Sequence, residues 1–84
     1  MLLLEYDEYQ IGDRVRCISD NNPRTLGKIG TVIDLSVYGN VGVDFGEDIG
    51  GHSMGGKTRF GYGWYLMAEE VELVSNKKES EQLG

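Results

Sequence analysis

The chain has little cysteine, little proline and no long hydrophobic run, and each shortage excludes a class of protein. A single cysteine, Cys17, rules out an internal disulfide and a cysteine-based zinc site. The apolar start at residues 1–4 is too short for the core of a secretory signal peptide. No stretch approaches the roughly 20 apolar residues of a membrane-spanning helix. We therefore expect a cytoplasmic protein.

Positive charge is also scarce. The chain has 14 acidic and 8 basic residues, which gives a formal net charge of −6. Undirected binding to nucleic acid or to anionic lipid needs a positive surface that displaces counterions. We therefore expect a protein partner, no membrane association, and nucleic acid only through a local basic patch.

Glycine, in contrast, is abundant, with 13 glycines against one proline in 84 residues. Glycine-rich chains with short apolar runs and some aromatic residues build turn-dense β structure rather than helix bundles. A chain of this length holds one small hydrophobic core. We therefore expect a single all-β domain.

Short alternating segments predict the first strands. Residues 14–17 alternate polar and apolar after a turn at Gly12-Asp13. Residues 27–35 are β-branched, and Gly30 within them indicates a bulge or a close backbone approach. A turn at 38–40 then joins this strand to residues 41–45, which completes a hairpin.

The end of the chain predicts two more strands. Residues 64–67 resume the sheet, residues 68–70 fit one helical turn, and residues 71–74 alternate again. We expect a domain over residues 1–74 and a disordered polar tail over residues 75–84. The expected inward-facing set is Val15, Cys17, Val32, Val43, Phe45, Leu66 and Leu73.

This order of elements resembles the SH3-like barrel. Residues 9–15 are similar to the diverging-turn segment of SH3 domains, and residues 63–74 to their last two strands with a one-turn helix between them. Gly27, Gly30 and Val32 match the short glycine pattern of KOW-type barrels. The resemblance implies a five-stranded barrel with a long glycine-rich loop between strands 3 and 4 and a one-turn 3-10 helix before the last strand.

The aromatic walls of a peptide-binding SH3 groove are largely missing. No tryptophan stands near Val41, and Met67 and Glu70 occupy places where such domains carry aromatic or proline residues. Recognition of proline-rich peptides needs flat aromatic walls. The resemblance therefore does not imply binding to proline-rich peptides.

A second resemblance concerns the glycine-rich segment. Gly51-His52, the paired glycines that follow and residues 61–65 are similar to small uncharacterised proteins encoded by bacteriophages and prophages. That resemblance implies the same barrel and a phage or bacterial origin. It implies no activity.

Residues 46–63 hold seven glycines and show no apolar periodicity. A long loop without secondary structure is uncommon in so small a domain and often functional. We therefore expect a non-enzymatic protein-interaction module without a cofactor, with this loop as its contact surface. Six candidate binding residues lie in or beside the loop: His52, Lys57, Arg59, Phe60, Tyr62 and Trp64.

The roles of the aromatic candidates stay open at this stage. Trp64 either anchors the core or joins an exposed aromatic surface, and a core this small favours the first reading. Phe60 and Tyr62 fit either packing within the loop or contact with a partner.

His52 is the only histidine, and Asp44, Glu47 and Asp48 lie near it in the sequence. A histidine with carboxylates can bind a divalent cation or act as an acid and base. Asp44, Asp48 and His52 are thus weak candidate metal ligands. The simpler interpretation is a histidine that hydrogen-bonds a loop carbonyl and pins the glycine-rich segment, because no second polar partner stands at a defined spacing.

Residues 51–58 match the spacing of a phosphate-binding loop, ending in Gly56-Lys57-Thr58. That motif needs a strand before it and a long helix after it. The glycine-rich residues 59–63 cannot start a stable helix, so the match is not expected to bind phosphate.

Two further hypotheses concern other surfaces. Nucleic-acid or ribosome binding of the KOW kind predicts a continuous positive patch of Arg14, Arg16, Lys57 and Arg59. Self-association predicts an exposed strand edge.

Overall fold

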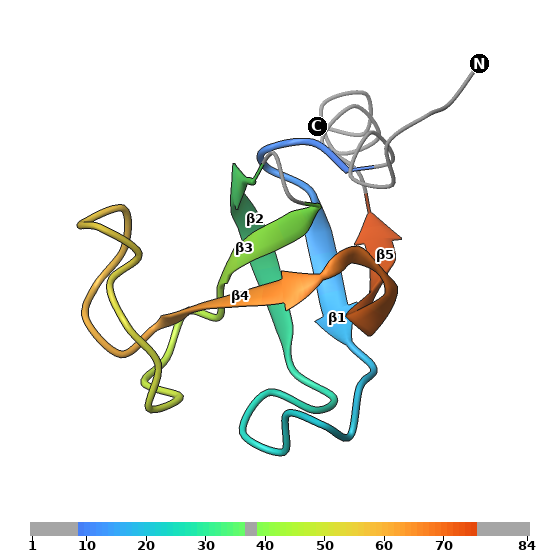
Figure 1. Ribbon diagram of the computed structural model, residues 1–84, viewed down its shortest axis with the longest axis horizontal. Helices are drawn as coiled ribbons and strands as arrows, with labels where there is room; N and C mark the ends of the chain where they lie inside the picture. Colours follow the sequence, from blue (N-terminus) through green and yellow to red (C-terminus); the bar gives the residue numbers. More distant parts are fainter. Residues whose placement is uncertain (1–8, 37–38, 76–84) are drawn as a thin grey trace.

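The computed structural model describes residues 9–36 and 39–75, and it confirms an all-β fold (Figure 1). Residues 1–8, Tyr38 and the predicted tail from residue 76 onward lie outside the described residues. No helix within the described ranges is long and apolar enough to cross a membrane. The elements are β1 (Arg14–Cys17), β2 (Ile29–Leu35), β3 (Asn40–Asp44), β4 (Gly63–Met67), the 3-10 turn η2 (Ala68–Glu70) and β5 (Val71–Ser75).

All five strands belong to one antiparallel sheet in the order β4-β3-β2-β1-β5. β4 and β5 stand at the two ends of this order, yet the three residues of η2 connect them. In a flat sheet, four strand spacings would separate them by about 19 Å, whereas η2 rises by only about 6 Å. The sheet is therefore strongly curled, which encloses one apolar face.

The enclosed face holds most of the predicted core. Val15, Val32 and Val43 are fully buried, and Cys17 and Leu66 are 1% exposed. The burial pattern of β1 alternates as expected, with both apolar side chains inside. The remaining buried apolar residues of the core cluster are Tyr9, Val41, Phe45, Ile49, Ala68 and Val71.

Leu73 was expected in the core, and this expectation is wrong. Leu73 pairs with Val15 and so lies on the same face of the sheet, but its side chain stays 45% exposed. β5 is the last strand in the order, so Leu73 has a neighbouring strand on one side only. Val71, which pairs with Cys17 and directly follows η2, takes the buried place in β5.

The predicted hairpin of β2 and β3 is present, and the close approach at Gly30 is confirmed. A Cβ at Gly30 would lie 2.5 Å from Val43 Cγ1 and 2.6 Å from the carbonyl oxygen of Asp44. The register between β2 and β3 shifts elsewhere, between Val32 and Asp34, and that between β1 and β5 shifts between Arg14 and Val15.

Two long loops extend from the sheet, residues 18–28 between β1 and β2 and residues 45–62 between β3 and β4 (Figure 1). The first is held from inside by Thr25, whose buried hydroxyl lies 3.2 Å from the Asn22 carbonyl oxygen and 3.2 Å from Cys17 Sγ. The two loops touch where Arg24 Nη1 donates a hydrogen bond of 2.9 Å to the Gly50 carbonyl. These loops position the candidate site.

Candidate functional site

The backbone of the loop at residues 45–62 is fastened to itself and to β4. The amides of Ile49 and Gly51 both donate to the Gly61 carbonyl, at 2.9 and 3.0 Å. His52 and Gly63 exchange two backbone hydrogen bonds of 3.0 and 2.9 Å, which forms a bridge beside β4. The expectation of a loop without internal structure is therefore corrected. Backbone hydrogen bonds order this segment although its sequence has no apolar periodicity.

Met54 anchors the middle of this loop. Its side chain is 4% exposed and lies over Gly42 of β3 and Gly63 of β4, where a Cβ at either glycine would collide with it. Met54 also has a positive φ of 56°, a conformation that non-glycine residues rarely adopt. This contact was not predicted from the sequence, although a glycine on each of two neighbouring strands is a signal for an inserted side chain.

Three rings form a row beside β4. The His52 ring centroid lies 5.4 Å from that of Trp64 and 5.8 Å from that of Tyr65. Trp64 and Tyr65 are successive residues of β4, so their side chains point to opposite faces of the sheet. His52 lies close to both rings because its backbone pairs with Gly63 at the edge of β4. His52 Nδ1 accepts a hydrogen bond of 3.2 Å from the Met54 amide. The histidine ring thus bonds the loop backbone, although its partner is an amide and not the carbonyl that the simpler interpretation expected.

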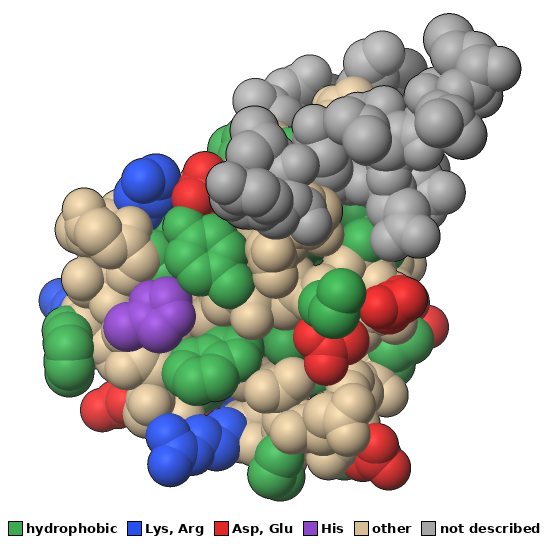
Figure 2. All heavy atoms as spheres, in the orientation of Figure 1, with side chains coloured by type: hydrophobic (Ala, Val, Ile, Leu, Met, Phe, Trp, Pro, Cys, Tyr) green, Lys and Arg blue, Asp and Glu red, His purple; other side chains and the backbone are tan. Residues whose placement is uncertain are grey.

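Figure 2 shows this face, with the histidine in purple between apolar side chains in green. Blue Lys and Arg side chains lie around it on the left, whereas most of the visible red carboxylates lie on the right. On the face shown in Figure 2, basic side chains therefore gather near the histidine.

Tyr65, which the sequence analysis did not select, also bonds a carboxylate. Its hydroxyl donates a short hydrogen bond to Asp34 Oδ2. This hydrogen bond, followed by burial and by the negative charge of Asp34, raises the pKa of Tyr65 above its ordinary value. Ser36 and Asn40 complete a polar hollow around this pair. The Tyr65 ring is thereby held in place through its hydroxyl group.

A second group of predicted residues lies farther along the loop. The Arg59 guanidinium carbon lies 5.5 Å from the centroid of the Tyr62 ring, and Arg59 Nη1 donates to the Tyr62 hydroxyl at 3.4 Å. Phe60, between them in the chain, is 78% exposed. Lys57 is exposed and makes no ion pair with any other described residue. The structure therefore joins His52 to Trp64, and Arg59 to Tyr62.

Trp64 combines its two predicted roles. It is partly buried and packs against the core cluster. Its ring also lines a hollow at the surface between the two loops. Trp64 is thus both a core residue and part of the accessible face.

The candidate metal ligands each serve the local backbone. Asp44 Oδ1 accepts a hydrogen bond of 2.8 Å from the Gly46 amide, and Asp48 Oδ1 accepts one of 2.9 Å from the Gly50 amide. Within residues 9–36 and 39–75, no group of three or more His, Cys, Asp or Glu side chains lies together in a way that could hold a metal ion.

In residues 51–58, which match the spacing of a phosphate-binding loop, three backbone amides already donate hydrogen bonds within the loop. Those of Gly56 and Thr58 donate to the Ser53 carbonyl at 3.1 Å, and that of Lys57 donates to the Met54 carbonyl at 3.4 Å. A phosphate cradle needs such amides free to face the ligand. The local hydrogen bonding therefore disfavours phosphate binding at residues 51–58.

The predicted positive patch is partly offset. Arg16 forms an ion pair of 2.8 Å with Glu72, and Arg14 donates a hydrogen bond of 3.0 Å to Thr31. In the two loops, Lys28 pairs with Glu47 at 3.3 Å, whereas neither Arg24 nor Arg59 has an ion pair among the described residues.

No protein-family model matches the chain, and no curated protein gives a significant match.

Proposed function

We propose that this domain is a non-enzymatic protein-interaction module built on an SH3-like barrel, with residues 46–63 as its contact surface. The curled sheet, the order β4-β3-β2-β1-β5 and the 3-10 turn between β4 and β5 support the barrel. A cytoplasmic location and a phage or bacterial origin stay predictions from the sequence.

The observation that carries this proposal is the exposure of Phe60 on a fastened loop. A phenylalanine that is 78% exposed gains a large apolar burial when a partner covers it. The loop is already ordered by the bonds to Gly61, the bridge at His52 and the buried Met54. Binding therefore requires little further loss of backbone entropy.

The neighbours of Phe60 strengthen the argument. Arginine and tyrosine are enriched among the residues that dominate binding energy at protein interfaces. The contact between Arg59 and Tyr62 orients both side chains beside Phe60 before any partner arrives. A central apolar side chain flanked by oriented polar groups is the usual anatomy of such an interface.

Photo-crosslinking tests the proposal. Phe60 is replaced by p-benzoylphenylalanine in the full chain, expressed in cells that naturally encode it, and the protein attached after irradiation is identified by mass spectrometry. The matched control places the same group at Leu73, which is also exposed but lies on β5. We expect a discrete adduct at position 60 only, whose purified partner binds the wild-type chain and fails to bind Phe60→Ser. Equal labelling from both positions, or none from position 60, would contradict the proposal.

Nucleic-acid binding of the KOW kind is the alternative, favoured by one observation. Trp64 of the ring row lines a hollow together with Arg24, which has no ion pair among the described residues, and aromatic rings with cations bind single strands. A gel shift with single-stranded oligonucleotides at several salt concentrations tests it. A shift that weakens with salt supports it, and no shift at low salt rejects it. Self-association through a sheet edge stays a prediction, which sedimentation checks.

A further inference from the structure

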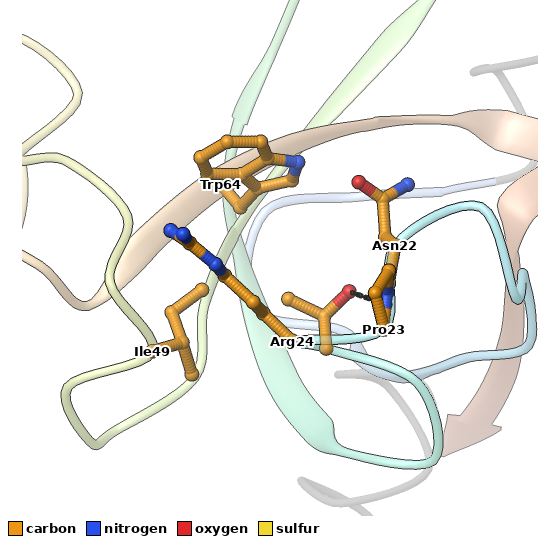
Figure 3. Close-up of a pocket in the computed structure, with 6 residues that line it drawn as sticks. Asn22, Pro23, Arg24, Ile49 and Trp64 are labelled. Atoms are coloured by element: carbon orange, nitrogen blue, oxygen red, sulfur yellow. Dashed lines mark hydrogen bonds between the residues drawn. The ribbon is translucent and has the colours of Figure 1, made fainter.

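An apolar hollow opens between the two loops, and Trp64 is the one lining residue that the sequence had already singled out. The hollow has a volume of about 150 Å³. Figure 3 shows the Arg24 side chain pointing from the loop at residues 18–28 toward Trp64 and Ile49, with Asn22 on the opposite side. The lining residues are Asn22, Pro23, Arg24, Thr25, Ile49 and Trp64.

The walls of this hollow are held before a ligand arrives. Ile49 is 6% exposed, and Thr25 is buried with its hydroxyl engaged. Pro23 is conformationally fixed by its ring. The hydrogen bond from Arg24 to the Gly50 carbonyl ties the two sides together. A pre-formed apolar surface of this kind binds without first having to be assembled.

The volume restricts the ligand to one small apolar group. Pockets for drug-sized ligands enclose roughly 300–1,000 Å³, so this hollow is too small for a nucleotide or an organic cofactor. An apolar cavity of about 150 Å³ is known to hold a benzene-sized molecule. A single aliphatic or aromatic side chain therefore matches the space.

The positive charge of Arg24 at the hollow favours an acidic residue next to the bound apolar side chain. Arg24 is the one charged residue among the lining residues, and it has no ion pair among the residues that the structure describes. A guanidinium carries several N–H donors, of which the Gly50 carbonyl takes only one in the described structure. The remaining donors are suited to a carboxylate, and an incoming cation would be repelled.

We propose that this hollow binds an apolar side chain of an acidic peptide segment, with an adjacent carboxylate paired to Arg24. The inference rests on the proposed function and extends it by naming the chemistry of the partner, and it adds a second contact to the one at Phe60. Trp64 supplies the apolar wall, and Arg24 supplies the preference for acid.

The single tryptophan of the sequence makes the test direct, because Trp64 emission reports on this hollow. The probe is the capped tripeptide Glu-Leu-Glu, titrated into the full chain. Two matched peptides remove one feature each: Glu-Ser-Glu lacks the apolar side chain, and Lys-Leu-Lys reverses the charge. We expect a saturable change with Glu-Leu-Glu and binding about tenfold weaker with either relative. No saturable change, or equal binding of Lys-Leu-Lys, would overturn the proposal.

Variants separate this site from the other surfaces. Arg24→Gln removes the charge and is expected to weaken Glu-Leu-Glu about tenfold, whereas Arg14→Gln, an exposed arginine on β1, is expected to leave binding unchanged. Phe60→Ser is also expected to leave the tripeptide affinity unchanged. A failure of crosslinking at position 60 with intact tripeptide binding would thus reject the proposed contact loop alone, and the reverse result would reject this hollow alone.

The binding site of the tripeptide can also be located on the wild-type chain, without any substitution. Amide chemical-shift mapping with Glu-Leu-Glu is expected to show its largest changes at Arg24, Gly50 and the Trp64 indole. Changes confined to residues 55–60 would overturn the assignment. Free 4-methylpentanoate serves as a further arm, and binding as tight as that of the peptide would identify a small carboxylic acid as the ligand instead.

Discussion

The curled sheet and the loop at residues 45–62 are stabilised by different means. The sheet buries aliphatic side chains that alternate along its strands, such as Val15, Val32 and Leu66. The loop buries the side chains of Phe45, Ile49 and Met54, and it is otherwise held by backbone hydrogen bonds and by the bridge beside β4.

The two regions therefore tolerate different substitutions. In the sheet, stability depends on the volume of side chains that are present, because the core is close-packed. At the base of the loop, stability also depends on side chains that are absent. A Cβ at Gly51 would overlap the Gly63 carbonyl oxygen, and one at Gly63 would lie 2.7 Å from Met54 Cγ. Glycine here permits close contact between two segments of backbone.

The largest expected effect comes from the sheet. Leu66→Ala leaves a cavity at a side chain that is 1% exposed and should lower the free energy of unfolding by about 3 kcal/mol. Urea denaturation followed by circular dichroism measures it. Sheet and loop should unfold together in this variant, since the loop is anchored on β3 and β4. A loss below about 1 kcal/mol would mean that Leu66 does not belong to a close-packed core.

Met54→Ala tests whether the loop is a separate unit. Removing the anchor should lower the free energy of loop opening by about 2 kcal/mol, which raises hydrogen exchange at the Gly51 amide about thirtyfold. Exchange at Val43, in the sheet, should change much less. Met67→Ala, at a methionine that is 52% exposed, is the control and should leave both amides unchanged. Equal acceleration at Gly51 and Val43 would show that loop and sheet open as one.

The difference between the two regions also explains what could be predicted. Strands with period-two alternation, such as residues 14–17 and 41–45, follow from the sequence because their burial is encoded in local pattern. Leu73 did not follow, because the pattern shows which face a residue shares but not whether a neighbouring strand covers it. The order of the strands decides that, and it is a long-range property.

The loop and the hollow were harder still. His52 contacts Trp64 and Tyr65 through a backbone bridge, and no spacing rule relates position 52 to position 63. The hollow joins Arg24 and Ile49 from two loops that are far apart in the chain. Such sites depend on how loops fold back on the sheet, so composition indicated the loop but not its contacts.

The hydrogen bond between Tyr65 of β4 and Asp34 of β2 provides a third test, which concerns the sheet. Because Asp34 raises the pKa of Tyr65 in the folded state, this pair stabilises the fold fully below the unfolded pKa of about 10. The contribution is lost as the pH rises through the higher folded pKa. Asp34→Asn should move the pKa of Tyr65 back toward 10, as measured by the ring carbon shifts of Tyr65 in a pH titration. Tyr62, for which Asp34 is not a partner, is the internal control, and an unchanged Tyr65 titration would contradict the assignment.

The smallest expected effect on stability belongs to the residue that carries the proposed function. Phe60→Ser removes a side chain that is 78% exposed, so the free energy of unfolding should change by no more than about 0.5 kcal/mol. The same change should abolish partner capture, because the apolar area that a partner would cover is gone. Urea denaturation and partner binding are both measured on the same preparation of the Phe60→Ser variant. Lost binding with lost stability would assign Phe60 to the architecture of the loop, whereas lost binding at constant stability assigns it to the contact surface.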